Sequence, residues 1–164
     1  MINLKSFCAK DNYRHMEIPW SRGAYTFATD GGIIVRVPKI PDIPDNANSP
    51  DALKLWAKVE IGNLEWTANL PDLPPVKMTP CEDCLGESRA AIRECEECGG
   101  MGNVRDVQNT VVDGMTYANK YLKLIKRLPG YKFYPVKHDL SISSVPPSYF
   151  TFDGGDGLLM PLRT

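Results

Sequence analysis

Four cysteines in two pairs are the residues of this chain best suited to chemistry. They follow the pattern C-x-x-C, ten residues, C-x-x-C, at Cys81, Cys84, Cys95 and Cys98. Thiolates are favoured ligands of Zn²⁺, and a gap of two residues lets both sulfurs of a pair face one ion. Four cysteines leave no coordination position for a reactive water, so we predict one structural zinc ion. A dithiol redox site and an iron centre are the alternatives.

The segment around these cysteines is acidic. Between residues 78 and 106 there are three arginines and seven acids: Glu82, Asp83, Glu87, Glu94, Glu96, Glu97 and Asp106. Four thiolates on one Zn²⁺ add two further negative charges. Phosphates would be repelled by such a segment, so a DNA-reading zinc finger is disfavoured, and a protein-binding or scaffolding role fits better.

A second candidate site is basic. We predict a helix over residues 116–128 whose apolar face is formed by Tyr117, Tyr121, Leu124, Ile125 and Leu128, and which Pro129-Gly130 ends. No acid occurs between residues 114 and 137, and the helix carries Lys120, Lys123, Lys126 and Arg127. Positions 120, 123 and 127 share one helix face, which could follow a phosphate backbone without reading sequence. From the pattern alone, a solvated helix face is the commoner explanation.

Composition limits the remaining possibilities. A chain of 164 residues, 43% hydrophobic and with net charge −1, predicts one domain or one domain with a small insert. No apolar run is long enough for a signal peptide or a membrane span, so we expect a cytoplasmic protein with no membrane partner. In that reducing compartment cysteines serve as metal ligands or thiols, and we expect Cys8 to be a plain buried thiol.

We predict no enzymatic activity. The chain has two histidines, His15 and His138, and neither lies in a nucleophile motif. No glycine-rich loop that could cradle a phosphate is present in the sequence.

Two similar hairpins indicate an internal duplication. Asp30-Gly31-Gly32 and Asp153-Gly154-Gly155 each follow an aromatic strand, and each precedes an apolar strand that ends in a proline eight residues after the aspartate. Two copies of one α+β unit would explain this, although any two hairpins share some features. Other expected elements are a helix over 50–60, with Leu53, Trp56 and Val59 inward, a linker over 71–80, and strands near 64–67, 104–113, 131–136, 140–143, 149–152 and 158–162.

The cysteine segment resembles the zinc domain of DnaJ-type chaperones. Residues 95–102 read C-x-x-C-x-G-x-G, and residues 81–88 match except that Ser88 replaces the last glycine. This resemblance implies a zinc hairpin, and it implies binding of client proteins as an alternative function.

Residues 112–163, together with 27–31, resemble the bacterial sliding clamp, the DNA polymerase III beta subunit. The similar motifs are Asn119-Lys120-Tyr121-Leu122, the helix end at 126–130, and the closing run from Phe152 to Arg163. The resemblance implies duplicated β-α-β-β-β units with helices on one side of curved sheets, and rings that surround duplex DNA. It also implies that the DNA-facing residues are Lys120, Lys123, Lys126 and Arg127.

By the same resemblance, residues at the C-terminal end would border a groove for partner peptides: Met160, Pro161, Leu162 and Arg163. A last core strand is the alternative for this segment. A clamp ring uses six such domains, and the sequence does not predict the oligomeric state.

Together these patterns predict an α+β, clamp-like fold in which 1–76 and 105–164 are two halves and 77–104 is an inserted zinc hairpin with four cysteine ligands. The expected function is a non-enzymatic, zinc-containing accessory protein, of a kind found in phages, that binds DNA non-specifically, replication proteins, or both. A DnaJ-type protein-binding module is the alternative.

Overall fold

The computed structural model of the chain describes residues 2–10, 16–46, 51–57, 59, 69–82, 101–105, 108–136 and 145–162. The strands predicted near 64–67 and 140–143 lie outside these residues, as do both histidines. Three of the four predicted zinc ligands, Cys84, Cys95 and Cys98, and the predicted groove residue Arg163 also lie outside them.

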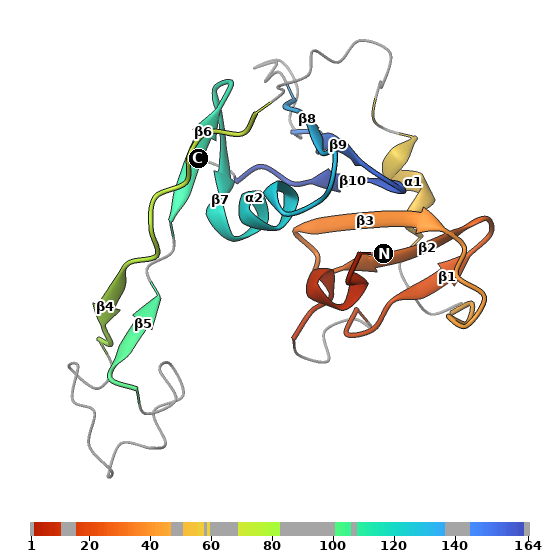
Figure 1. Cartoon of the computed structure of the whole chain (residues 1–164), viewed down its shortest axis with the longest axis horizontal. Coiled ribbons are helices and arrows are strands. Elements are labelled where there is room, and N and C mark those ends of the chain that lie inside the picture. The colour runs from red at the N-terminus through yellow and green to blue at the C-terminus, as the bar shows by residue number, and fades with distance from the viewer. Residues whose placement is uncertain are drawn as a thin grey trace.

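A six-stranded antiparallel sheet dominates the described part of the chain (Figure 1), which is mixed α+β with few helices. Its strands, in spatial order, are β1 (Trp20–Arg22), β2 (Tyr25–Thr29), β3 (Ile33–Pro38), β10 (Gly155–Leu159), β9 (Ser148–Phe152) and β8 (Lys132–Tyr134). The two predicted hairpins, around Asp30-Gly31-Gly32 and Asp153-Gly154-Gly155, are therefore present, and they meet in the centre of one sheet.

The strand order is symmetric about the central pair of β3 and β10. On either side, a hairpin partner and then an edge strand follow, and each group of three strands is preceded by a helical segment. These segments are η1 (Leu4–Phe7), a single 3-10 turn, and α2 (Asn119–Lys126). A duplicated unit would produce this order, so the arrangement agrees with the predicted repeat. The finer prediction of a clamp fold stays a prediction.

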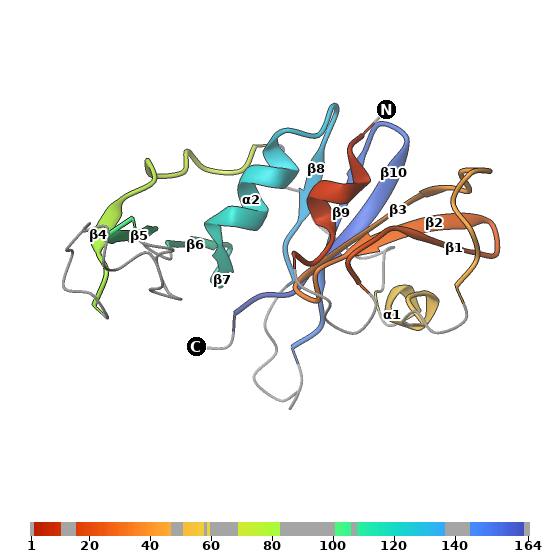
Figure 2. The same ribbon diagram turned by 90° about the horizontal axis from the view of Figure 1, so that it is seen from below.

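Helical segments cover the two faces of the sheet unequally. η1 and α2 lie next to each other on one face (Figure 2), where Phe7 and Leu122 join Val35 and Phe150 in the larger core. The other face is covered by α1 (Leu53–Trp56), whose Trp56 packs in a smaller aromatic cluster with Trp20, Phe27 and Tyr149.

The helix predicted over 116–128 begins three residues later than expected. Asp113 and Gly114 have φ values of 49° and 82°, as a type I′ turn requires, and they join β6 (Asn109–Val112) to β7 (Met115–Ala118). Tyr117, assigned by sequence to the helix face, is therefore a strand residue that pairs with Thr110. The Asp-Gly turn signal lies just before the predicted helix, but the apolar residues after it were assigned to the helix and not to the second strand of a hairpin.

Two further predictions were partly wrong. Among the described residues of the helix expected over 50–60, α-helical geometry is confined to α1, where Leu53 is 38% exposed although Trp56 is buried as predicted. The last strand ends at Leu159 rather than 162, because the chain then leaves β3. Met160 N donates to Gly32 O, and Leu162 N donates to Thr116 O of β7.

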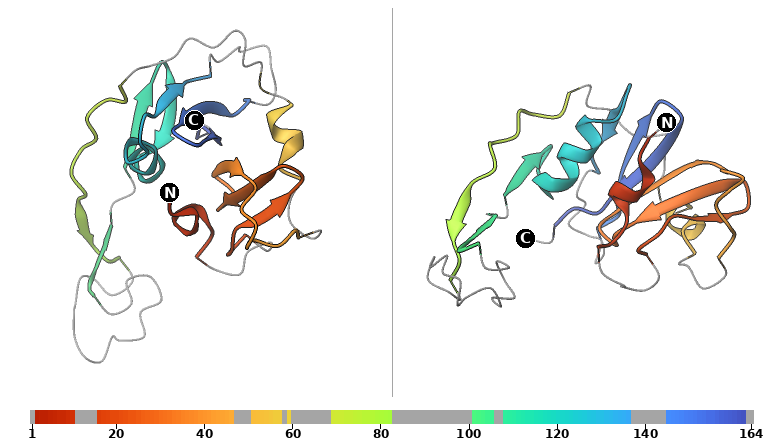
Figure 3. Two further views of the ribbon diagram at one scale, coloured as in Figure 1. Left: turned by 45° about the vertical axis from the view of Figure 1, so that its right-hand side comes forward. Right: turned by 60° about the horizontal axis from the view of Figure 1, so that its bottom comes forward.

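A separate two-stranded ribbon carries the start and the end of the cysteine segment. β4 (Met78–Pro80), the last part of the predicted linker, pairs with β5 (Asn103–Arg105), and Cys81 N donates to Gly102 O at 2.9 Å. The ribbon projects away from the six-stranded sheet (Figure 3). The two ends of the predicted insert are thus held side by side.

One carboxylate links the two halves across the β3–β10 pair. Asp156 accepts two bonds from the Arg36 guanidinium, at 2.7 and 2.8 Å, and one each from Trp56 Nε1 and the Tyr149 hydroxyl, at 3.0 and 2.9 Å. The guanidinium carbon lies over the rings of Tyr25 and Trp56, at 4.6 and 4.4 Å from their centroids. Burial, and then the Asp156 charge, raise the pKa of Tyr149, which keeps its hydroxyl a donor.

We expect Asp156→Ala to destabilise the protein by about 3 kcal/mol, because it leaves the mostly buried Arg36 guanidinium without its counter-charge. Lys39→Ala, which breaks the exposed Lys39–Asp45 pair, should cost less than about 1 kcal/mol. Urea unfolding followed by tryptophan fluorescence measures both. Equal, small losses in the two variants would contradict a central role for Asp156.

Candidate functional site

Helix α2, which carries the predicted basic face, is attached to the core along one side. Leu122 and Ile125 are fully buried and Leu128 is nearly so, whereas Leu124, predicted to be inward, is only partly buried. The opposite side of the helix therefore faces away from the sheet. The sequence predicted an amphipathic helix correctly, but its predicted buried face is offset by about one residue from the face that is buried in the structure.

The two Asp-Gly-Gly turns hold the two ends of α2. At its beginning, the Tyr121 hydroxyl donates to Asp30 Oδ2 at 3.0 Å, and Gly32 packs so closely on the Tyr121 ring that a Cβ would overlap with it. At its end, Asp153 N donates to Pro129 O at 2.9 Å, and Gly130, with φ of 62°, lies against the Asp153 carboxylate. Each copy of the repeated turn thus fixes one end of the helix.

The four predicted DNA-facing residues differ in exposure. The side chain of Lys120 is 68% exposed, that of Lys126 is 30% exposed, Lys123 is partly exposed, and Arg127, which caps the helix, is exposed. All four belong to or directly follow α2, so the structure brings them to one element as predicted.

Acidic partners reach two of these bases from distant parts of the chain. Lys120 Nζ lies 3.7 Å from Asp30 Oδ2 and 4.4 Å from the centroid of the Tyr121 ring. Burial alone would lower the pKa of Lys120, but its contacts with Tyr121 and Asp30 outweigh burial and raise it. Both neighbours therefore favour the charged ammonium in its present position.

Lys126 is held by the segment that leads to the ribbon. Its ammonium donates to the carbonyls of Leu70 and Pro71, at 3.4 and 3.1 Å, and lies 3.5 Å from Asp72 Oδ1. Leu70 itself is buried in the core. Within the part of the chain that the structure describes, Lys123 and Arg127 have no such acidic partner. The sequence could not reveal this division, because Asp30 and Asp72 lie 90 and 54 positions from the lysines that they meet.

The predicted groove residues at 160–162 differ in their exposure to solvent. Met160 and Leu162 are 43% and 37% exposed, while Pro161 between them is buried. Backbone bonds at positions 160 and 162 tie this segment to the β2–β3 turn and to β7. Residues 160–162 therefore have one side packed against the rest of the protein and the other side exposed to solvent.

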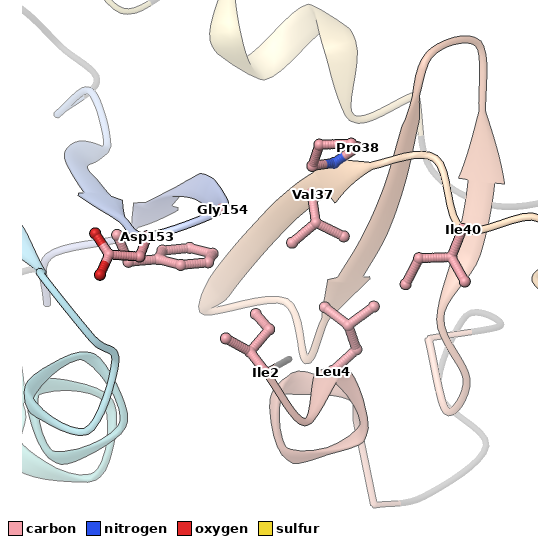
Figure 4. A pocket seen from close by; sticks show the side chains of 8 residues that line it. Ile2, Leu4, Val37, Pro38, Ile40, Asp153 and Gly154 are labelled. Carbon is pink, nitrogen blue, oxygen red and sulfur yellow. The ribbon is translucent and has the colours of Figure 1, made fainter.

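An apolar hollow of about 430 Å³ opens where η1 approaches the end of β3 (Figure 4). Ile2 and Leu4 face Val37 and Ile40 across it, and the Asp153 carboxylate points away from them. A neighbouring hollow of about 450 Å³ lies between η1 and α2, and Arg127 is part of its lining. The short η1 covers less of its half of the sheet than α2 does, which leaves these hollows open.

Cys81 is the one predicted zinc ligand among the described residues. It is fully buried, although the strand residues before it, Met78–Pro80, are all exposed. Because the other three predicted ligands lie outside the described residues, no cluster of three metal-binding side chains occurs within them. Burial of a thiol at the tip of an exposed ribbon fits a ligand that faces an enclosed ion.

Cys8, at the end of η1, is buried as predicted. Desolvation, with the Asp30 and Glu17 charges in support, raises its pKa to about 11. Since the thiolate is the reactive form, a raised pKa keeps this side chain in its less reactive thiol form at neutral pH.

Comparisons with known proteins do not extend these observations. No family model, no curated protein and no solved structure matches the chain. Among the helices in the described ranges, none is long and apolar enough to cross a membrane.

We expect Gly32→Ala to destabilise the protein by about 1–3 kcal/mol, because the new methyl group would overlap with the Tyr121 ring. Combining it with Tyr121→Ala should remove most of that additional cost, which a double-mutant cycle of urea unfolding measures. Strictly additive losses would show that the β2–β3 turn does not hold the beginning of α2.

Proposed function

We propose that the protein is a non-enzymatic, clamp-like accessory protein that binds duplex DNA non-specifically through the exposed side of α2. The observation that carries the proposal is the attachment of this helix at both ends, which presents Lys120, Lys123 and Arg127 from one rigid element. Cations on a fixed helix can neutralise successive phosphates and release their counterions, without contacts to base edges.

The charge environment of α2 sets the expected strength of binding. Lys123 and Arg127 have no described acidic partner, whereas Lys120 and Lys126 lie near Asp30 and Asp72. Two cations with no acidic partner among the described residues support weak binding that falls with rising salt. Assembly of several copies around one duplex would multiply these contacts, as the clamp resemblance implies.

We expect Lys123/Arg127→Ala to weaken binding of a duplex oligonucleotide and to reduce the slope of log K against log[salt] by about two, because two phosphates would no longer be neutralised. Lys54/Lys77→Ala removes the same charge from exposed positions outside α2 and should have a much smaller effect. Fluorescence anisotropy at several salt concentrations measures the slopes. Binding that is absent or insensitive to salt in the wild type would contradict the proposal.

We further propose that the cysteine hairpin holds one structural zinc ion through Cys81, Cys84, Cys95 and Cys98. The supporting observation is that β4 and β5 form an isolated ribbon with exposed strand residues, and an isolated two-stranded ribbon is at best marginally stable in water. A metal at its tip would contribute folding free energy on the order of 10 kcal/mol.

We expect atomic absorption to find one zinc per chain, and Cys81→Ser to lose most of it. Because the ribbon forms a sheet of its own, chelation should disorder residues near Cys81 while the core around Trp20 and Trp56 persists. Amide NMR spectra with and without chelator distinguish the two regions. Collapse of the whole spectrum, or retention of all ribbon signals, would contradict this arrangement.

A protein-binding role for the ribbon is a second candidate function. Three large apolar side chains on or beside it are exposed: Val76 by 51%, Met78 by 52% and Met101 by 66%. Flexible methionines suit surfaces that accept varied apolar partners. If zinc-loaded protein suppresses aggregation of an unfolded client, Met78/Met101→Ser should reduce that activity. Absence of suppression in the wild type would exclude this role.

A further inference from the structure

We infer that Asp30 is a positioning residue that weakens the interaction of α2 with polyanions, by holding Lys120 and by placing a negative charge beside the basic side of the helix. This inference rests on the proposed DNA-binding function and concerns the regulation of that same site. It assigns Asp30 a role beyond the turn chemistry for which its Asp-Gly-Gly sequence is suited.

The two carboxylate oxygens of Asp30 have separate partners. Oδ1 accepts from the backbone N–H groups of Gly32 and Ile33, at 3.0 and 3.2 Å, and so closes the β2–β3 turn. Oδ2 accepts from the Tyr121 hydroxyl at 3.0 Å and lies 3.7 Å from Lys120 Nζ. The turn requires only an acceptor oxygen, which an asparagine also supplies. The negative charge is needed only by the second set of contacts, which involves α2.

Lys120 already has a negatively charged neighbour, because its ammonium lies 3.7 Å from Asp30 Oδ2. Its ammonium lies over the Tyr121 ring, at 4.4 Å from the centroid, and near the carboxylate, while its side chain remains 68% exposed. A phosphate that approaches α2 therefore competes with Asp30 for the same cation. Asp30, whose side chain is 22% exposed, also repels that phosphate directly.

Lys126 depends less on its acidic neighbour than Lys120 does, so Asp30 is a stronger candidate than Asp72 for weakening the binding of polyanions. Its ammonium is held by two backbone carbonyls in addition to the fully exposed carboxylate of Asp72. Removal of the Asp72 charge would leave those carbonyl contacts in place, so Lys126 would stay where it is. Among the described residues, the position of Lys120 depends on a single charged partner, Asp30, and a substitution can remove that charge.

The experiment compares duplex binding by the wild type and by Asp30→Asn at low salt, about 0.05 M. Asparagine preserves the turn acceptor and removes the charge, so we expect binding about threefold tighter and a steeper salt dependence. Asp42→Asn is the matched control, because Asp42 is exposed in the loop after β3 and no described base pairs with it. Lys120→Met in the Asp30→Asn background should remove most of the gain.

A second measurement is independent of DNA. Because Asp30 helps to raise the pKa of Lys120, we expect Asp30→Asn to lower that pKa, and Asp42→Asn to leave it unchanged, in NMR titrations of the lysine Cε resonances.

The outcomes separate the two proposals. If no variant binds duplex, both the proposed function and this role of Asp30 are overturned. If the wild type binds and Asp30→Asn binds no more tightly than Asp42→Asn, the role of Asp30 is overturned and the proposed function stands. An unchanged Lys120 pKa in Asp30→Asn also overturns the role of Asp30.

Discussion

The pairing of β3 with β10 is the interaction on which the rest of the structure depends. It joins strands separated by 120 positions at Arg36 and Asp156, and it places the two repeated hairpins in one sheet. Closing so long a loop has an entropic cost, which the strand pairing and the mostly buried Arg36–Asp156 contact offset. Without this pair, each half would have three short strands and one incompletely covered face.

Helix α2 depends on the β3–β10 pair, because its two ends contact turns that belong to the two different halves. Asp30 and Gly32 contact its beginning, and Asp153 contacts its end. Asp30, together with Asp72 from the segment before β4, also reduces the effective charge of the helix. A segment without a single acid in its sequence becomes, in three dimensions, a helix with two partly neutralised lysines. The proposed interface therefore binds phosphates more weakly than the four basic residues of the sequence suggested.

The hairpins, the α+β class, the main helix and the burial of Cys8 and Trp56 could be predicted, since each follows from local turn chemistry or periodicity. The start of α2 could not, because apolar residues such as Tyr117 fit strand β7 and a helix equally well. Likewise, the contacts of Asp30 with Lys120 and of Asp72 with Lys126 arise from pairing over long separations, which no local pattern encodes. The zinc ligands rest on spacing alone for three of four cysteines, and the clamp resemblance stays a prediction.

Titration of duplex DNA into ¹⁵N-labelled, zinc-loaded protein tests most directly that α2, and not the cysteine ribbon, is the nucleic-acid interface. We expect amide shifts to change at and around Lys120, Lys123 and Arg127, and along the neighbouring β2–β3 turn, while the signals of β4 and β5 remain in place. Changes confined to the ribbon, or no changes at any DNA concentration, would contradict it.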